Sequence, residues 1–400
     1  MCQFQQVLYY MKQFDKNEML KTWKIEHTIF AVILGINVLL RFYNFSSWSL
    51  SNDELSAIFR LRFETLGELF QEGIKIDGHP AFTQLFLYYW TKIFGLSTFS
   101  IRFPFVISGI IGSVYFYKFI RLFVNKHAAI LSFASLSCSQ LFILYSQLAR
   151  PYAFGFLFTM GFAYYWYRLI MNPDKRLIQI AFILFGFCGI LSHYFASMTI
   201  SLLLVSGLLF FSKSNYKSYI LSALVICILF LSHLSITLFQ LNIGGVAWLP
   251  VPTEDFIYQF FHFLANDTVW VLYFIVVFPL IALISKQFQV TYWKIYLLPF
   301  LFFIPYSIAY YYSIHKSPLM QFSVLIFFAP FLIAFFFSFF SDKSNIKLTA
   351  SLSFIIIIVG LYSLNFERKF YQKRAFADFK GVSESVIEWT KKYKKANTLN

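Results

Sequence analysis

A polar segment between two long apolar runs, residues 46–102, contains most of the side chains that could carry out chemistry. The adjacent acids Asp53 and Glu54 could serve as a general base for a hydroxyl group or as metal ligands. His79 precedes a proline, and Arg102 stands at the start of the next apolar run. The S-N-D-E stretch is also a capping-box pattern that opens an amphipathic helix. The acids therefore have a structural interpretation beside the catalytic one.

Further candidates stand at the predicted outer ends of later apolar runs. Arg150 and Tyr152, in Q-L-A-R-P-Y, could bind a phosphate and hydrogen-bond a sugar, because the planar guanidinium suits phosphate oxygens. His193 in S-H-Y-F is a candidate substrate ligand, and Lys316 in S-I-H-K-S-P is a candidate phosphate ligand. Each has a simpler structural interpretation. An arginine can extend to the membrane interface, tyrosines gather there, and His79 can belong to an ordinary turn.

Composition places these residues in a membrane protein. The 400 residues are 59% hydrophobic and only 13% charged, and apolar runs of about 18 or more residues recur along the chain. The net charge of +15 comes from short Lys and Arg clusters between these runs, which orient a membrane protein and do not form a nucleic-acid-binding stripe. Three of the four cysteines lie inside apolar runs, so we expect neither an external disulfide nor a metal cluster.

The apolar runs predict an all-α polytopic protein with about eleven transmembrane helices. The predicted spans are 28–45, 101–123, 128–146, 151–170, 177–194, 196–212, 217–241, 268–285, 293–313, 318–340 and 346–365. None of them contains an acidic residue, although ion-coupled transporters usually keep a carboxylate near the middle of the membrane. This absence weakens the transporter class.

Basic residues orient the spans. Four lysines within the first 24 residues keep the N-terminus in the cytoplasm, so that loop 46–100 lies outside. Segment 81–95 is short for a span, and it would move every later basic cluster outside if it crossed. It is therefore predicted to be a surface helix, like the amphipathic segment 53–64. The predicted division is a transmembrane domain, 1–366, and an extracytoplasmic tail, 367–400.

At these residues the chain resembles the bacterial protein-mannosyltransferase and RgtA/B/C/D-like glycosyltransferases, which have the GT-C fold. The resemblance is carried by W-S-L-S-N-D-E, D-G-H-P-A-F, F-G-L-S-T-F-S-I-R-F-P and S-Q-L-A-R-P-Y-A, and it covers roughly the first 200 residues. Beyond them, the match is general topology together with S-H-Y-F and W-L-P.

The resemblance implies a membrane enzyme of the bacterial cytoplasmic membrane, with its active site outside. It implies that a sugar moves, with inversion, from a polyprenyl-phosphate donor to a cell-envelope glycan, lipid or protein. Asp53 matches the family's catalytic carboxylate, while His79, Arg102 and Arg150 match positions near the lipid phosphate. The alternatives are a lipid-linked oligosaccharide polymerase or ligase, and a lipid-linked-sugar transporter or flippase. A polymerase or ligase typically has arginines in a large late outer loop, but loop 242–267 contains no Arg or Lys.

Two departures from the family pattern bear on the site. Ala81 stands where H-P-P has its second proline, and Gln321 stands in the stretch where relatives have an Arg-Tyr pair. Lys316 is the expected substitute for the missing arginine. Relatives that use a metal carry a second acid near A-R-P-Y, and residues 147–153 contain none. A metal-independent mechanism without a cofactor is therefore favoured over one that uses a divalent metal.

Overall fold

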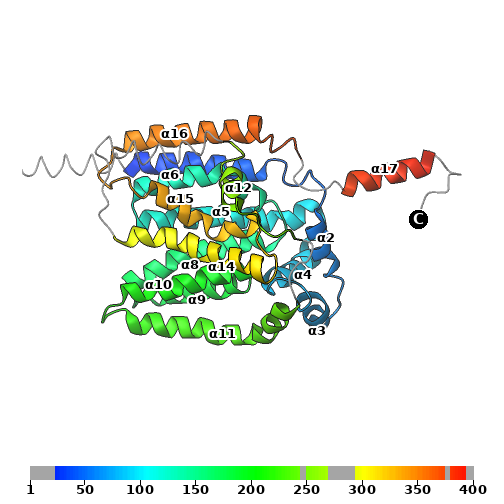
Figure 1. Ribbon diagram of the computed structural model, residues 1–400, viewed down its shortest axis with the longest axis horizontal. Coiled ribbons are helices and arrows are strands. Elements are labelled where there is room, and N and C mark those ends of the chain that lie inside the picture. Colours follow the sequence, from blue (N-terminus) through cyan, green and yellow to red (C-terminus); the bar gives the residue numbers. More distant parts are fainter. Residues whose placement is uncertain (1–22, 244–248, 269–292, 374–378, 393–400) are drawn as a thin grey trace, which may run out of the picture.

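The computed structural model describes residues 23–243, 249–268, 293–373 and 379–392, and the regular elements within these ranges are helices. Long helices lie side by side along the longest axis of the molecule (Figure 1). The α-helices, long and short, begin with the first helix, Trp23–Phe42. It is followed by α2 (Asn52–Phe59), α3 (Leu66–Glu68), α4 (Phe82–Phe94), α5 (Thr98–Phe123), α6 (Lys126–Ser137), α7 (Gln140–Leu144), α8 (Pro151–Met171), α9 (Arg176–Ile190), α10 (Tyr194–Ser206), α11 (Tyr216–Asn242), α12 (Phe256–Leu264), α14 (Leu297–His315), α15 (Ala329–Phe337), α16 (Ile346–Tyr362) and α17 (Phe379–Lys392).

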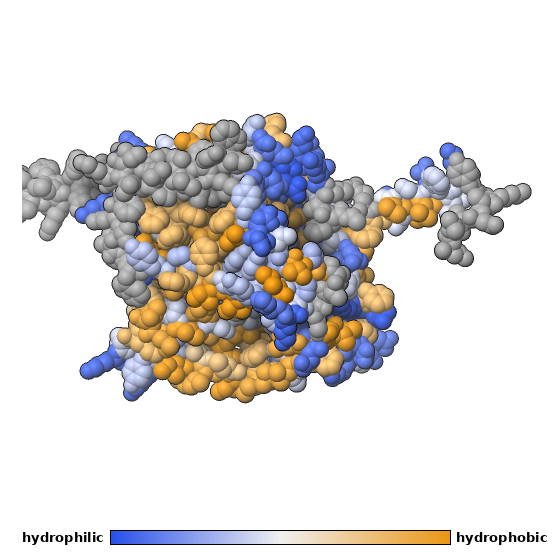
Figure 2. Space-filling view, viewed as in Figure 1, coloured by the Kyte–Doolittle hydropathy of each residue, from blue (hydrophilic) through white to orange (hydrophobic). Residues whose placement is uncertain are grey.

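The chain is a multi-pass membrane protein. Five described helices are long and apolar enough to cross a bilayer: Trp23–Phe42, Thr98–Phe123, Tyr216–Asn242, Lys294–His315 and Ile346–Glu367. Hydrophobic residues cover much of the visible face over the long helices, and hydrophilic residues gather toward the end that carries α2, α3 and α4 (Figure 2). The predicted number of eleven spans stays a prediction, because the span expected at 268–285 falls almost wholly outside the described residues.

Two predicted spans are interrupted. The segment expected as 128–146 divides at Cys138 and Ser139 into α6 and α7. Asn266 bridges this break, since its side chain accepts from Gln140 N–H at 2.7 Å and donates to the Cys138 carbonyl at 2.9 Å. The segment expected as 318–340 is likewise divided into a 3-10 helix, Phe322–Phe327, and α15. The first break is held by a tertiary contact that hydrophobicity along the chain does not report, whereas the second falls just before Pro330, in the first turn of α15.

Close packing of α5 against α8 brings two parts of the site together. A side chain at Gly109 of α5 would overlap Ser146, which lies in the turn before α8, and one at Gly112 would overlap Phe156. Glycine at these positions lets the two backbones approach closely. The start of α5, capped by Ser97, thus lies near the turn that carries Arg150.

The first loop forms a cap of short helices at one end of the bundle. In Figure 1, α2, α3 and α4 lie together at that end, and α17 projects beyond it. The predicted amphipathic helix 53–64 is shorter than expected, because α2 ends at Phe59. Helix α4 matches the surface helix expected at 81–95.

Candidate active site

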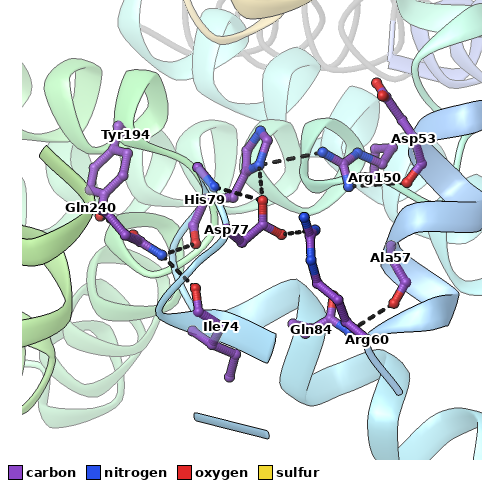
Figure 3. Close-up of polar contacts among 11 residues, drawn as sticks. Asp53, Ala57, Arg60, Ile74, Asp77, His79, Gln84, Arg150, Tyr194 and Gln240 are labelled. Atoms are coloured by element: carbon purple, nitrogen blue, oxygen red, sulfur yellow. Dashed lines mark hydrogen bonds and ion pairs between the residues drawn. The ribbon is translucent and has the colours of Figure 1, made fainter. Parts of the chain in front are cut away.

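The carboxylate of Asp77 is the centre of a polar cluster in the first loop (Figure 3). Its Oδ2 accepts from Arg60 Nη1 at 2.7 Å, and its Oδ1 lies 3.2 Å from His79 Nδ1. The backbone N–H of Gly78 donates to the same Oδ1 at 2.7 Å. Asp77 is buried, so these contacts replace the hydrogen bonds that water would make to an exposed carboxylate.

The cluster holds Asp77 in its charged form. Burial alone would raise the pKa of this carboxyl group, but the hydrogen bond from His79 and the nearby arginines outweigh burial and hold the pKa well below its ordinary value. Asp77 is therefore a permanent anion across the neutral range. Its role in this geometry is to orient His79 and to balance the arginine charges.

Arg150 links His79 to the start of α2. It is the residue immediately before α8, whose first position is proline, and its guanidinium is buried. Nη2 lies 3.4 Å from His79 Nδ1, and Nη1 donates to the backbone oxygen of Asp53 at 3.3 Å. Arg150 Nε is enclosed and has no hydrogen-bond partner. Both of these contacts are long, so this guanidinium keeps capacity to bind an anion.

The loop that carries His79 is fixed by α11. Gln240 of that helix donates to the carbonyl oxygens of Ile74 at 2.7 Å and His79 at 2.9 Å (Figure 3). The hydroxyl of Tyr194 donates to the other end of the Gln240 amide. One buried amide therefore sets the position of the imidazole from 161 residues away in the sequence.

His193 lies beside His79 as a buried, uncharged donor. Its ring centroid is 5.1 Å from that of His79 and 5.8 Å from that of Tyr152. Its Nδ1 accepts the N–H of Phe195 at 3.1 Å, so Nε2 carries the proton. Desolvation by burial, together with the neighbouring charges of His79 and Arg150, lowers the pKa of His193 well below its ordinary value. It is neutral at neutral pH.

Asp53 is exposed on the first turn of α2. Figure 3 places Arg150 between Asp53 and His79. The structure thus brings together five of the residues singled out in the sequence, namely Asp53, His79, Arg150, Tyr152 and His193.

Glu54 and Arg102 are paired with each other and not directed to a ligand. Arg102 donates from Nε and Nη2 to the two oxygens of Glu54, at 2.8 and 2.7 Å. Its remaining N–H groups donate to the backbone oxygens of Phe45, Trp48 and Ser49. All five guanidinium donors are occupied. Contrary to the expectation from the sequence, Arg102 therefore has no donor left for a phosphate.

The carboxylate oxygens of Glu54 are likewise occupied by hydrogen bonds. It is fully buried and accepts from the N–H groups of Ser51 and Ala149 in addition to Arg102. The reciprocal bond from Glu54 N–H to Ser51 Oγ completes the capping box that the sequence indicated. Each Glu54 oxygen accepts two hydrogen bonds, so this carboxylate anchors the loop and, contrary to the expectation from the sequence, is not available as a base.

Lys316 lies apart from the cluster. It is exposed at the end of α14, with its ammonium group 5.5 Å from the ring of Tyr312. No contact within the described ranges joins it to His79 or Arg150. Gln321 is the residue immediately before the 3-10 helix Phe322–Phe327.

Sequence reasoning missed Asp77, Arg60 and Gln240 as parts of the cluster. Asp77 had a signal, since D-G-H-P places a carboxylate two residues before the imidazole. Arg60 and Gln240 had none, because only the fold brings them to the loop. In the described part of the chain, no group of three or more His, Cys, Asp or Glu side chains forms a metal-binding cluster.

Comparisons with known proteins agree with this architecture. Residues 78–236 match the family model described as dolichyl-phosphate-mannose-protein mannosyltransferase. That segment runs from the D-G-H-P motif into α11. None of the curated proteins matches the sequence at a significant level.

Among solved structures, apo ArnT from Cupriavidus metallidurans is similar, with a TM-score of 0.57 and 12% identity. The similarity covers 80% of this chain and 61% of ArnT, so the chain spans less than two thirds of that protein. ArnT bound to undecaprenyl phosphate gives a TM-score of 0.40 at 13% identity, covering 92% of this chain and 65% of that one. The apo oligosaccharyltransferase from Archaeoglobus fulgidus gives 0.40 at 12% identity, covering 91% and 54%.

The predicted fold class is confirmed, because the described helices match the fold of apo ArnT at a TM-score of 0.57. The comparisons thus give a mannosyltransferase family model over residues 78–236 and, for the described helices, the fold of apo ArnT.

Proposed function

We propose that this protein transfers a sugar from a polyprenyl-phosphate donor to an acceptor hydroxyl group outside the bacterial cytoplasmic membrane, with the N-terminus in the cytoplasm. The observation that carries the proposal is the pairing of an exposed carboxylate with a buried cation. Asp53 faces solvent, while Arg150, which donates to the Asp53 backbone, keeps an enclosed Nε without a partner. A base and an anion-binding group thus adjoin each other at one end of the bundle.

Arg150 and the two histidines suit a departing phosphate. Negative charge builds up on the phosphate oxygens as the sugar bond breaks, and donors already held in place stabilise that charge without reorganising. Arg150 supplies a fixed positive charge, and His193 supplies a neutral N–H whose tautomer is set by Phe195. Asp77 holds the His79 ring in position through its contact with Nδ1. ArnT, whose fold this chain shares, has been solved bound to undecaprenyl phosphate.

Asp53 suits the acceptor. As general base it removes the hydroxyl proton while the acceptor oxygen bonds to the anomeric carbon. The bond from that carbon to the phosphate oxygen breaks on the opposite side, its electrons leave with the phosphate, and the configuration inverts. The acceptor is a hydroxyl group of a cell-envelope glycan, lipid or protein. The proposed mechanism uses no metal or other cofactor, and in it Tyr152 hydrogen-bonds the sugar.

The test is release of polyprenyl phosphate from a panel of polyprenyl-phosphate sugars, with the purified protein in nanodiscs and a crude membrane acceptor. Wild type is compared with Asp53→Asn, and Glu72→Gln serves as the matched control because it removes another exposed carboxylate from the same loop. We expect release by wild type and Glu72→Gln and none by folded Asp53→Asn.

Each other outcome contradicts a specific part of the proposal. Equal release by Asp53→Asn would exclude Asp53 as the base. In a parallel assay with polyprenyl-diphosphate-linked oligosaccharides, release of polyprenyl diphosphate, with none from the monophosphate donors, would indicate the polymerase or ligase class. No release from any donor by folded protein would exclude transfer and favour a transporter of lipid-linked sugars.

A further inference from the structure

Arg41 lies in the last turn of the first helix, at the same end of the bundle as the first loop, and its side chain is fully buried. Its hydrogen bond from Nη1 reaches the carbonyl of Asn37 at a distance of 3.3 Å. Arg41 Nε and Nη2 are enclosed and have no partner. Arginine keeps its proton in proteins, so a charge is buried here.

The two unpartnered nitrogens form the edge of the guanidinium that binds two oxygens at once. Arg102 uses this edge, Nε with Nη2, to bind both oxygens of Glu54. Arg121 uses it to bind both oxygens of Glu26. At Arg41, no group of the described residues bonds to the same edge. The protein's own arginines therefore show what this edge accepts, which is an anion with two oxygens.

Nothing in the described ranges supplies that anion to Arg41. The titratable side chains beside it are those of Tyr371 and Cys138, and neither is a carboxylate. Asp267, a carboxylate at this end of the bundle, pairs with Arg368 at 3.1 Å. A buried cation without a counter-ion is strongly unfavourable, and ionisable residues inside membrane helices generally mark a binding site.

The surroundings of Arg41 narrow the chemistry of the anion. Asn37, one turn earlier, donates to Ser137 at 2.9 Å but leaves its own Oδ1 enclosed and without a donor. A bound anion that also carries a hydroxyl group could donate to Asn37 Oδ1 while its other oxygens accept from Arg41. Tyr371 donates to the Leu40 carbonyl at 2.6 Å, so the C-terminal segment lies over this site.

We propose that Arg41 binds a hydroxyl-bearing phosphate group through Nε and Nη2, at a site separate from the Arg150 cluster. The two sources of that chemistry are free hydrogen phosphate and the headgroup of an anionic phospholipid. The proposal does not depend on sugar transfer, because it follows from an unbalanced charge and two unsatisfied groups.

The test measures binding of phosphatidylglycerol by native mass spectrometry and of inorganic phosphate by titration, each on detergent-purified protein at fixed ionic strength. Arg41→Gln removes the charge and the two-nitrogen edge, whereas Arg41→Lys keeps the charge alone. Arg62→Gln is the matched control, since Arg62 is an exposed arginine of the first loop. We expect one ligand bound per wild-type and Arg62→Gln chain, with affinity about 10- to 100-fold weaker in Arg41→Gln, as for one charge-assisted contact. Arg41→Lys should be intermediate.

The two probes separate the sources. Binding of inorganic phosphate that displaces the lipid assigns a free phosphate, and binding of the lipid alone assigns a headgroup. Equal affinity in wild type and Arg41→Gln, or in wild type and Arg41→Lys, would overturn the proposal. If Arg41→Gln does not fold, an electron cryomicroscopy map of the wild-type protein decides: tetrahedral density beside Nε supports the proposal and a single water overturns it.

Discussion

Replacing Arg102 by methionine separates its two roles, anchor of the first loop or ligand of a phosphate. The substitution leaves Glu54 fully buried without its cation, and it leaves the carbonyls of Phe45, Trp48 and Ser49 without their donors. Breaking a buried ion pair by removing one partner costs about 3–5 kcal/mol. The lost backbone contacts act in the same direction, so we expect the free energy of unfolding to fall by at least about 3 kcal/mol.

The assay is equilibrium unfolding in detergent of wild type, Arg102→Met, Glu54→Gln and the double variant. If the two side chains act mainly through each other, the double variant will lose much less stability than the sum of the single losses, with a coupling energy of about 2–3 kcal/mol. Arg62→Met is the control. It removes an exposed arginine, so its effect should stay within about 0.5 kcal/mol.

The affinity of Arg102→Met for the sugar donor is the measurement that could refute this reasoning. If Arg102→Met unfolds like wild type but binds a polyprenyl-phosphate sugar much more weakly, then the guanidinium faces the ligand. That outcome would restore the interpretation of Arg102 as a phosphate ligand and contradict its five occupied donors.

Three further predictions concern the cluster. Arg150→Gln should weaken donor binding about 10- to 100-fold by removing a charge-assisted contact, and unchanged affinity in a donor titration would count against that contact. Asp77→Asn should lower kcat more than it changes KM, because it removes the anion that orients His79 and balances Arg60; steady-state kinetics with normal turnover would contradict this. His193 should make the free energy of unfolding fall as the pH drops below about 6.5, by up to about 1.4 kcal/mol per pH unit, since the unfolded imidazole binds a proton that the buried one does not. His193→Phe should flatten that slope, and an unchanged slope would show that other groups cause it.

The polar cluster shows which site residues can be predicted from short sequence motifs and which cannot. D-G-H-P and A-R-P-Y singled out His79 and Arg150, and the fold brings their side chains to 3.4 Å. Gln240 could not be found this way, because a glutamine inside an apolar run has no local signal. Its amide acts on the backbone of the first loop, and only the packing of α11 brings it there.

The neighbouring acids Asp53 and Glu54 also show what the sequence alone cannot predict. Asp53 and Glu54 follow each other in the sequence, and the capping-box pattern correctly indicated a bond between Ser51 and Glu54. Whether either carboxylate faces solvent depends on Arg102, 48 residues later, and on the Ala149 amide. Successive residues on a helix face different directions, so one acid is buried in a saturated pair while its neighbour remains exposed.

The sequence by itself determined the membrane class, the helical fold class and the loop that carries the polar cluster. Those properties follow from the length of apolar runs and from short motifs, which act locally because a backbone in lipid must satisfy its own hydrogen bonds. Only the tertiary structure decided which charges are cancelled and which remain available. Arg102 is saturated, whereas Arg150 and Arg41 keep unpartnered N–H groups. That difference depends on acceptors supplied by distant segments, because an arginine's free donors are set by whatever the fold packs around them.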